Sequence, residues 1–192
     1  MAAGYSLVEL IFVAGLVVTL SAVAVPQTLA ALDDSRTVGA ARYIAGRLQR
    51  ARMEAVMRSS DVGVRFTQAA DGRYAFAVYV DGNNNGVRST EIRSGIDRPL
   101  MPPEKLSDTF TNVDFGALPS LPPADAGGTP PGADPIRLGA SSIATFTANG
   151  TSSTGSLYIR GQRAQYVVRL FGDTAKTRVM KFEASTGKWR PL

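Results

Sequence analysis

The sequence contains neither histidine nor cysteine. Their absence excludes disulfides, thiolate nucleophiles, imidazole bases, Ser-His triads and zinc sites built from cysteine and histidine. The chain also lacks a Walker-type phosphate loop. The adjacent carboxylates Asp33 and Asp34 are interpreted as part of a helix surface rather than as a catalytic pair. We therefore expect a protein that is not an enzyme and that holds no cofactor.

Charge is also scarce, since only 19% of the 192 residues are charged whereas 44% are hydrophobic. This composition predicts a folded domain with an appendage rather than a disordered chain. The net charge of +5 is unevenly distributed. Residues 137–192 contain nine basic and two acidic side chains, whereas residues 59–136 contain six basic and ten acidic ones. The C-terminal end is therefore the candidate contact for an anionic partner.

One long segment, from Leu10 to Leu32, has no charge at all. At about 1.5 Å per residue, a helix of this length crosses a hydrocarbon core about 30 Å thick. One interpretation is a secreted β protein whose signal peptide is cleaved after Ala24, because Ala22-Val23-Ala24 fits such a site. A plain transmembrane anchor is a second interpretation. Glu9 at the edge of the run favours a third interpretation, in which the segment has a more specific function than anchoring. The reason is that a carboxylate at membrane depth is costly and indicates a function.

The segment Gly4–Leu10, GYSLVEL, resembles the N-terminus of type IV prepilins and type II secretion pseudopilins. The resemblance implies that a prepilin peptidase cuts after Gly4 and that Tyr5 becomes the N-methylated first residue. It also implies that Glu9 pairs with the new amine of a neighbouring subunit, and that Pro26 is the helix-kinking proline of the class. The implied partners are other pilins or pseudopilins in a filament, the prepilin peptidase and the bacterial inner membrane.

The spacing of apolar residues in 33–58 predicts an amphipathic continuation of this helix, ended by Ser59-Ser60-Asp61. The apolar positions at helical spacing are Ala41, Ile44, Ala45, Leu48, Ala51 and Ala55. The segment Ala51–Ala55 is similar to the helix end of the GspH/FimT subfamily of minor pseudopilins, as are the turn at Asp81–Gly86 and the basic tail. The resemblance implies a leader at 1–4, a transmembrane and filament-core helix at 5–32, and a periplasmic β-rich domain at 59–192.

Alternating apolar residues and turn signals predict a series of strands in this domain. They span residues 62–68, 73–80, 136–138, 143–148, 156–160, 165–171 and 177–183. On one of them we expect Tyr166, Val168 and Leu170 to face the core, with Gln165 and Arg169 outward. The segment of about 99–135 holds nine of the eleven prolines and is expected to be a long loop, disordered over 120–134. The predicted fold class is α+β and pilin-like, with one long N-terminal helix packed on antiparallel sheet.

The turn after the second strand offers a weak calcium candidate. Asp81, Asn83 and Asn85 place oxygens at alternate positions, and Gly86 follows as in an EF-hand loop. The twelfth position is Ile92 instead of glutamate, however, and asparagine and glycine are also the residues that a tight turn needs. We therefore favour a turn without a metal.

The basic C-terminal end offers a candidate nucleic-acid contact. Gly187-Lys188-Trp189-Arg190 is similar to the Gly-Arg-x-Arg motif with which some FimT-like pilins bind DNA, and Arg178 lies on a nearby predicted strand. Trp189 would stack on a base, and the two cations would contact phosphates. The main hypothesis is a non-enzymatic minor pseudopilin of a type II secretion pseudopilus or of a type IV pilus. The alternatives are a pilus-associated DNA receptor and the secreted β protein.

Overall fold

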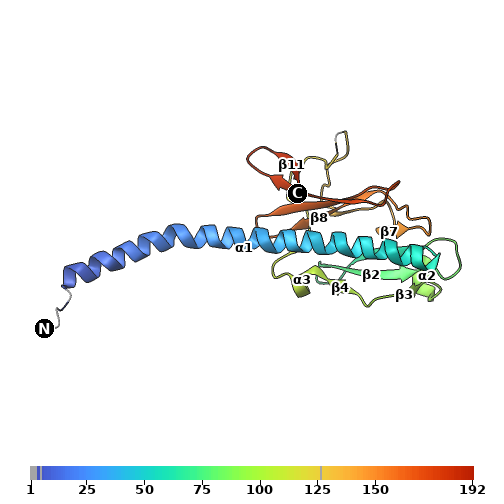
Figure 1. Ribbon diagram of the computed structural model, residues 1–192, viewed down its shortest axis with the longest axis horizontal. Helices are drawn as coiled ribbons and strands as arrows, with labels where there is room; N and C mark the ends of the chain where they lie inside the picture. The colour runs from blue at the N-terminus through green and yellow to red at the C-terminus, as the bar shows by residue number, and fades with distance from the viewer. Residues whose placement is uncertain (1–3, 5, 126) are drawn as a thin grey trace.

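A helix of 52 residues, α1 (Leu7–Arg58), leads from the N-terminal end of the molecule into a β-rich domain (Figure 1). The computed structural model describes residues 4, 6–125 and 127–192, and in it the first half of α1 projects from the domain and curves gently. Ser6 caps the helix, because its hydroxyl accepts the Glu9 N–H at 3.2 Å. Ser59 ends it in the left-handed conformation, with φ 51°. The predicted end of the helix is confirmed.

Among the described residues, the remaining elements form two antiparallel sheets and two short helices. The helices are α2 (Ser89–Ser94) and α3 (Leu106–Thr109). The strands are β1 (Val62–Gln68), β2 (Tyr74–Val80), β3 (Arg98–Pro99), β4 (Glu104–Lys105), β5 (Asp114–Phe115), β6 (Ile136–Arg137), β7 (Ile143–Phe146), β8 (Gly155–Arg160), β9 (Gln165–Leu170), β10 (Thr177–Glu183) and β11 (Lys188–Pro191). Each strand predicted from the sequence is present, with ends that differ by at most two residues.

The first sheet has the order β3-β2-β1-β7, with β4 also paired to β2. Its centre is the hairpin of β1 and β2, in which Val62 lies opposite Val80 and Gln68 lies opposite Tyr74. The second sheet has the order β11-β10-β9-β8-β5, with β6 also paired to β8. Figure 1 places β2, β3 and β4 below α1 in the view and β8 and β11 above it.

The second half of α1 packs against both sheets and forms the centre of the main core. Four alanines and two larger residues of the helix are buried there, which lets the strands approach its backbone closely. The buried apolar residues of α1 are Ala40, Ala41, Ile44, Leu48, Ala51 and Ala55. The predicted apolar face is confirmed at every position but Ala45, which is partly buried. The predicted α+β fold class is also confirmed.

A second, smaller core covers the other face of the second sheet, and the sequence did not predict it. Tyr158, Val167 and Met180 are buried there with Leu121 from the proline-rich segment. The prediction of disorder over 120–134 is therefore wrong at Leu121, which is only 3% exposed. The proline-rich segment as a whole also contains β3, β4, α3 and β5.

The expectation that Gln165 of β9 faces water is wrong, because Gln165 is buried although it lies on the face of the sheet opposite Tyr166, Val168 and Leu170. Its side-chain amide donates to the carbonyls of Gly116 and Ile159, each at 3.1 Å, and its oxygen accepts the Leu118 N–H at 2.9 Å. The physical reason is that the segment around residues 116–124 lies over this face of the sheet. Strand alternation alone assumes that one face of the sheet is in water.

Candidate assembly surface

The first half of α1 exposes its apolar side chains on every side. None of the described residues before Thr37 is buried, and Leu7, Phe12 and Val18 are among the most exposed. An 18-residue window of this helix has a mean hydropathy of 2.4 and is unburied throughout, so the helix is long and apolar enough to span a membrane. A contiguous exposed apolar surface of this kind marks a contact with lipid or with other helices.

Residues near the N-terminal end of α1 carry the predicted processing and assembly functions. Gly4 is exposed and lies before the helix, and Tyr5 lies outside the described residues. Glu9 is exposed in the first turn of α1, with its backbone N–H bound by Ser6. Among the described residues, no cation forms an ion pair with its carboxylate. Pro26 lies inside the helix, seven residues before Asp33, which is the first residue of α1 with a hydrogen bond to the β-rich domain among the described residues.

Asp33 attaches α1 to the turn between β8 and β9. Its carboxylate accepts the backbone N–H groups of Gln162 and Arg163 at 2.8 Å and of Ala164 at 3.0 Å. A Cβ atom at Gly161 would clash with this carboxylate, so the turn needs glycine there. Partial burial alone would raise the pKa of Asp33, but the three N–H donors and the Arg163 charge outweigh it and lower the pKa.

Asp34 makes a second attachment to the same sheet. Its Oδ1 atom accepts the Tyr166 hydroxyl at 2.8 Å and lies 2.7 Å from the Lys181 Nζ atom. Burial, with help from the Asp34 hydrogen bond, raises the pKa of Tyr166, which keeps its hydroxyl protonated as a donor. Asp33 and Asp34 together fix the direction in which the exposed half of α1 leaves the domain. Sequence reasoning placed both on the helix surface but missed their partners, which are more than 120 residues away.

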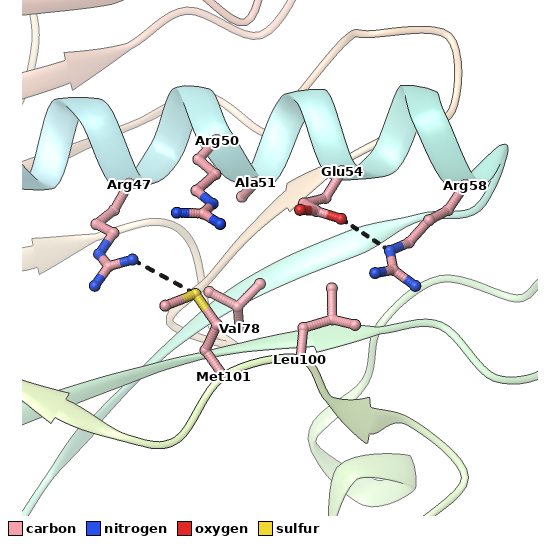
Figure 2. A pocket seen from close by; sticks show the side chains of 8 residues that line it. All are labelled: Arg47, Arg50, Ala51, Glu54, Arg58, Val78, Leu100 and Met101. Atoms are coloured by element: carbon pink, nitrogen blue, oxygen red, sulfur yellow. Dashed lines mark hydrogen bonds and ion pairs between the residues drawn. The ribbon is translucent and has the colours of Figure 1, made fainter.

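A pocket lies between the C-terminal end of α1 and strand β2 (Figure 2). Arg47, Arg50 and Arg58 line it from the helix, over a floor of Val78, Leu100 and Met101. Arg47 is held by Glu104, at 2.6 Å between Nη2 and Oε1, and Arg58 is held by Glu54 at 2.9 Å. The volume of about 90 Å³ and the internal ion pairs indicate a braced helix end rather than a ligand site.

The loop at Asp81 is closed by its own hydrogen bonds. The buried Asp81 carboxylate accepts the backbone N–H groups of Asn83, Asn84 and Gly86, at 2.6–3.0 Å. The Asn83 and Asn85 side-chain amides both donate to Glu91. This is the geometry of an Asx-type turn, as the sequence favoured. Within the described part of the chain, no group of acidic residues is arranged to hold a metal ion.

The predicted DNA-contact residues lie on the β10–β11 hairpin. Gly187 occupies its turn, with φ 64°, and Lys188 and Arg190 are exposed on β11. Arg178 is exposed on β10, whereas Arg190 pairs with Glu183 at 3.1 Å. Trp189 is engaged within the domain. Its ring centroid lies 5.3 Å from that of Phe182 and 5.8 Å from that of Tyr158, and its Nε1 donates to the Pro122 carbonyl at 3.0 Å.

Comparisons with solved structures show limited similarity. A structure of the minor pseudopilin EpsH from the type 2 secretion system of Vibrio cholerae matches with a TM-score of 0.47 and 14% identity. The match covers 76% of this chain and 97% of that one. A second crystal structure of EpsH gives a TM-score of 0.40 and 13% identity, covering 83% and 94%. No curated protein sequence matches the chain.

The family comparison is more direct. The sequence model described as type II transport protein GspH matches residues 40–174, which is more than half of the chain. The matched region includes α1 from Ala40 onward, the whole first sheet, and strands β5, β6, β8 and β9 of the second sheet. This match confirms the predicted resemblance to minor pseudopilins of type II secretion, and neither alternative function is needed to explain it. The chain belongs to the GspH family of type II transport proteins.

Proposed function

We propose that the chain is made as a prepilin, cut after Gly4 by the prepilin peptidase and N-methylated on Tyr5. Residues 5–32 then span the inner membrane once and leave the β-rich domain in the periplasm until the subunit enters the pseudopilus. The observation that carries this proposal is the continuity of α1, in which a fully exposed apolar half and a domain-bound half form one helix. The subunit has a structural role and no catalytic one.

In the filament, Glu9 sets the register between neighbouring subunits. Its carboxylate is exposed and has no ion pair within the described residues. The Tyr5 amine that cleavage creates is a cation of matching chemistry on the next subunit. In apolar surroundings an unpaired carboxylate is costly, so pairing favours the one register that brings Glu9 to that amine.

The first test is the mass of the mature chain from cells with and without the prepilin peptidase. We expect the peptidase to remove residues 1–4 and to add one methyl group at Tyr5. A signal peptide cleaved after Ala24 would shorten the chain by a further twenty residues, and that mass would overturn the proposal. A Gly4→Leu variant should stay uncut, because the prepilins that the chain resembles are cut after a leader that ends in glycine.

The second test is co-purification with the other pseudopilins of the same system. Glu9→Gln should abolish co-assembly because the amide cannot pair with the amine, while the mass shows normal processing. Glu54→Gln is the matched control, since it removes the same charge from the same helix at a residue that pairs with Arg58. Normal co-assembly of Glu9→Gln would remove the proposed function of Glu9.

DNA binding by Gly187, Lys188, Trp189, Arg190 and Arg178 stays a prediction. Lys188 and Arg190 are exposed and fit phosphate contacts, but Trp189 would have to leave Phe182 and Tyr158 before it stacked on a base. Fluorescence anisotropy of labelled duplex DNA tests this function. Binding that survives physiological salt and falls in a Lys188→Ala/Arg190→Ala variant would support it.

A further inference from the structure

Three arginines form a single row across four strands of the second sheet. The strand register places Arg137 opposite Ser156, Ser156 opposite Arg169, and Arg169 opposite Arg178. Directly opposed residues in a sheet point to the same face, so these side chains share one face. It is the face opposite α1, because Leu157 and Val168, the sequence neighbours of Ser156 and Arg169, belong to the main core beneath the helix.

Such a row is unfavourable without an anion, because like charges on directly opposed positions repel. Contacts with the Phe171 ring and with Asp125 nevertheless hold two of the arginine side chains in place. The guanidinium carbons of Arg169 and Arg178 lie 5.7 and 5.3 Å from the centroid of the Phe171 ring. Asp125 is the acidic residue that pairs with the row, at 2.5 Å from Arg169 Nη2. Within the described residues, Arg137 and Arg178 have no ion pair, so the row keeps an excess of positive charge.

A pocket of about 180 Å³ opens beside the row. Its polar lining includes Arg137, Arg169 and the buried Ser156, and its apolar lining includes Pro123 and Tyr158. The Arg169 Nε atom is buried and has no hydrogen-bond partner within the described residues. A buried donor without an acceptor is costly, so the domain itself does not satisfy the full hydrogen-bonding capacity of Arg169.

We propose that this arginine row binds an acidic segment of a partner protein, whose carboxylates contact Arg137, Arg169 and Arg178. Asp125 occupies part of the site as an internal carboxylate and competes with the partner. The proposal goes beyond the pseudopilin function argued above, because the row contains no residue of α1 and needs neither processing nor the Glu9 contact.

The geometry favours carboxylates on a peptide over the phosphates of a nucleic acid. Arg137 and Arg169 are two strand spacings apart in the sheet, roughly 10 Å, which an extended peptide with acidic side chains can span. Asp125 already places a carboxylate on Arg169, so that chemistry fits the site. Pro123 and Asp125 stand beside the row and line the pocket with it, whereas a duplex requires an open basic surface.

The test is fluorescence anisotropy with the full chain in a non-ionic detergent. The probe is a fluorescein-labelled peptide of alternating glutamate and alanine, and the comparison peptide has glutamine in place of glutamate. We expect the glutamate peptide to bind and the glutamine peptide not to bind. Asp125→Asn should tighten binding roughly fivefold because it removes the competing carboxylate, and Arg169→Gln should weaken it by about tenfold or more.

Two further variants separate the site from net charge and from misfolding. Arg98→Gln removes the same charge from an exposed position on the first sheet, and it should change the affinity less than about twofold. Arg169→Lys keeps the charge but loses the planar guanidinium, and it should give an intermediate affinity. Urea denaturation of each variant confirms that the domain is folded during the titration.

Three results would overturn the proposal. The first is equal binding of the glutamate and glutamine peptides by the wild-type chain. The second is an Asp125→Asn variant that binds the glutamate peptide more weakly, since that would make Asp125 purely structural. The third is displacement of the peptide by duplex DNA whose own binding also depends on Arg137 and Arg169. That result would assign the row to nucleic acid instead.

Discussion

The two halves of α1 differ in where their partners lie. Residues 33–58 bury Ile44, Leu48 and several alanines against strands of the same chain. Residues 7–32 bury nothing within the described structure, although their mean hydropathy is higher. The first half is therefore built for surroundings outside the chain, and the second half for its own domain. Asp33 and Asp34 mark the boundary between the two halves.

The largest difference should appear when one leucine is shortened in each half. Leu48→Ala should lower the free energy of unfolding of the domain by about 3 kcal/mol, because Leu48 is fully buried and the change leaves a cavity. Leu16→Ala should change it by less than about 0.5 kcal/mol, because Leu16 is exposed. Urea denaturation in detergent, followed by the fluorescence of Trp189, the single tryptophan, measures both. Equal losses would contradict the division of α1.

The contacts of Asp33 at this boundary should contribute less to the free energy of unfolding than the buried core does. Asp33→Asn weakens three charge-assisted hydrogen bonds from the β8–β9 turn and should cost about 1–2 kcal/mol at neutral pH. Urea denaturation at a series of pH values measures this cost. Asp173→Asn, at an exposed position in the next turn, is the control and should have no effect.

The cost of Asp33→Asn should also depend on pH. The pKa of Asp33 is lower in the folded protein than in the unfolded chain, so its stabilisation is complete above the unfolded value of about 3.9. It is lost as the pH falls through the lowered folded value. The wild-type chain and the variant should therefore converge in acid, and a difference that grows toward low pH would refute the attachment.

This attachment illustrates what a sequence can and cannot predict. The helical spacing of Ala41, Ile44 and Leu48 is local, so it predicted the buried face of α1 correctly. The partners of Asp33 are the backbone N–H groups of residues 162–164, and backbone groups leave no signal in side-chain pattern. The nearest available signal was a pair of carboxylates directly after a long uncharged run.

The second sheet shows the same limit on a larger scale. Alternation in β9 correctly assigned Tyr166 and Val168 to the core, but the buried Gln165 and Val167 were missed. Their burial depends on a loop that lies over the sheet, and prolines in that loop indicated irregular structure without indicating its position. The strand β11 was missed because its four residues carry two cations and a proline.

A smaller effect is expected at Tyr166. Tyr166→Phe keeps the buried ring but removes the hydrogen bond to Asp34, which retains its ion pair with Lys181. The expected cost is about 1 kcal/mol in the free energy of unfolding. Because the two attachments share one short segment of α1, Asp33→Asn/Tyr166→Phe should cost more than the two single changes together. A double-mutant cycle in urea measures that coupling, and strict additivity would show that the attachments act independently.

The smallest effect on the domain should come from Pro26→Ala. Pro26 lies in the exposed half, so the free energy of unfolding of the domain should change by less than about 0.5 kcal/mol. The shape of α1 should change instead, because alanine restores the N–H that proline lacks and removes the clash that bends a helix. The chain has no cysteine, so spin labels at Val13→Cys and Met53→Cys report one distance along the exposed surface of α1. We expect this distance to lengthen in Pro26→Ala. If the domain lost stability and the distance stayed constant, Pro26 would belong to the domain, and the boundary between the two halves of α1 would lie before it.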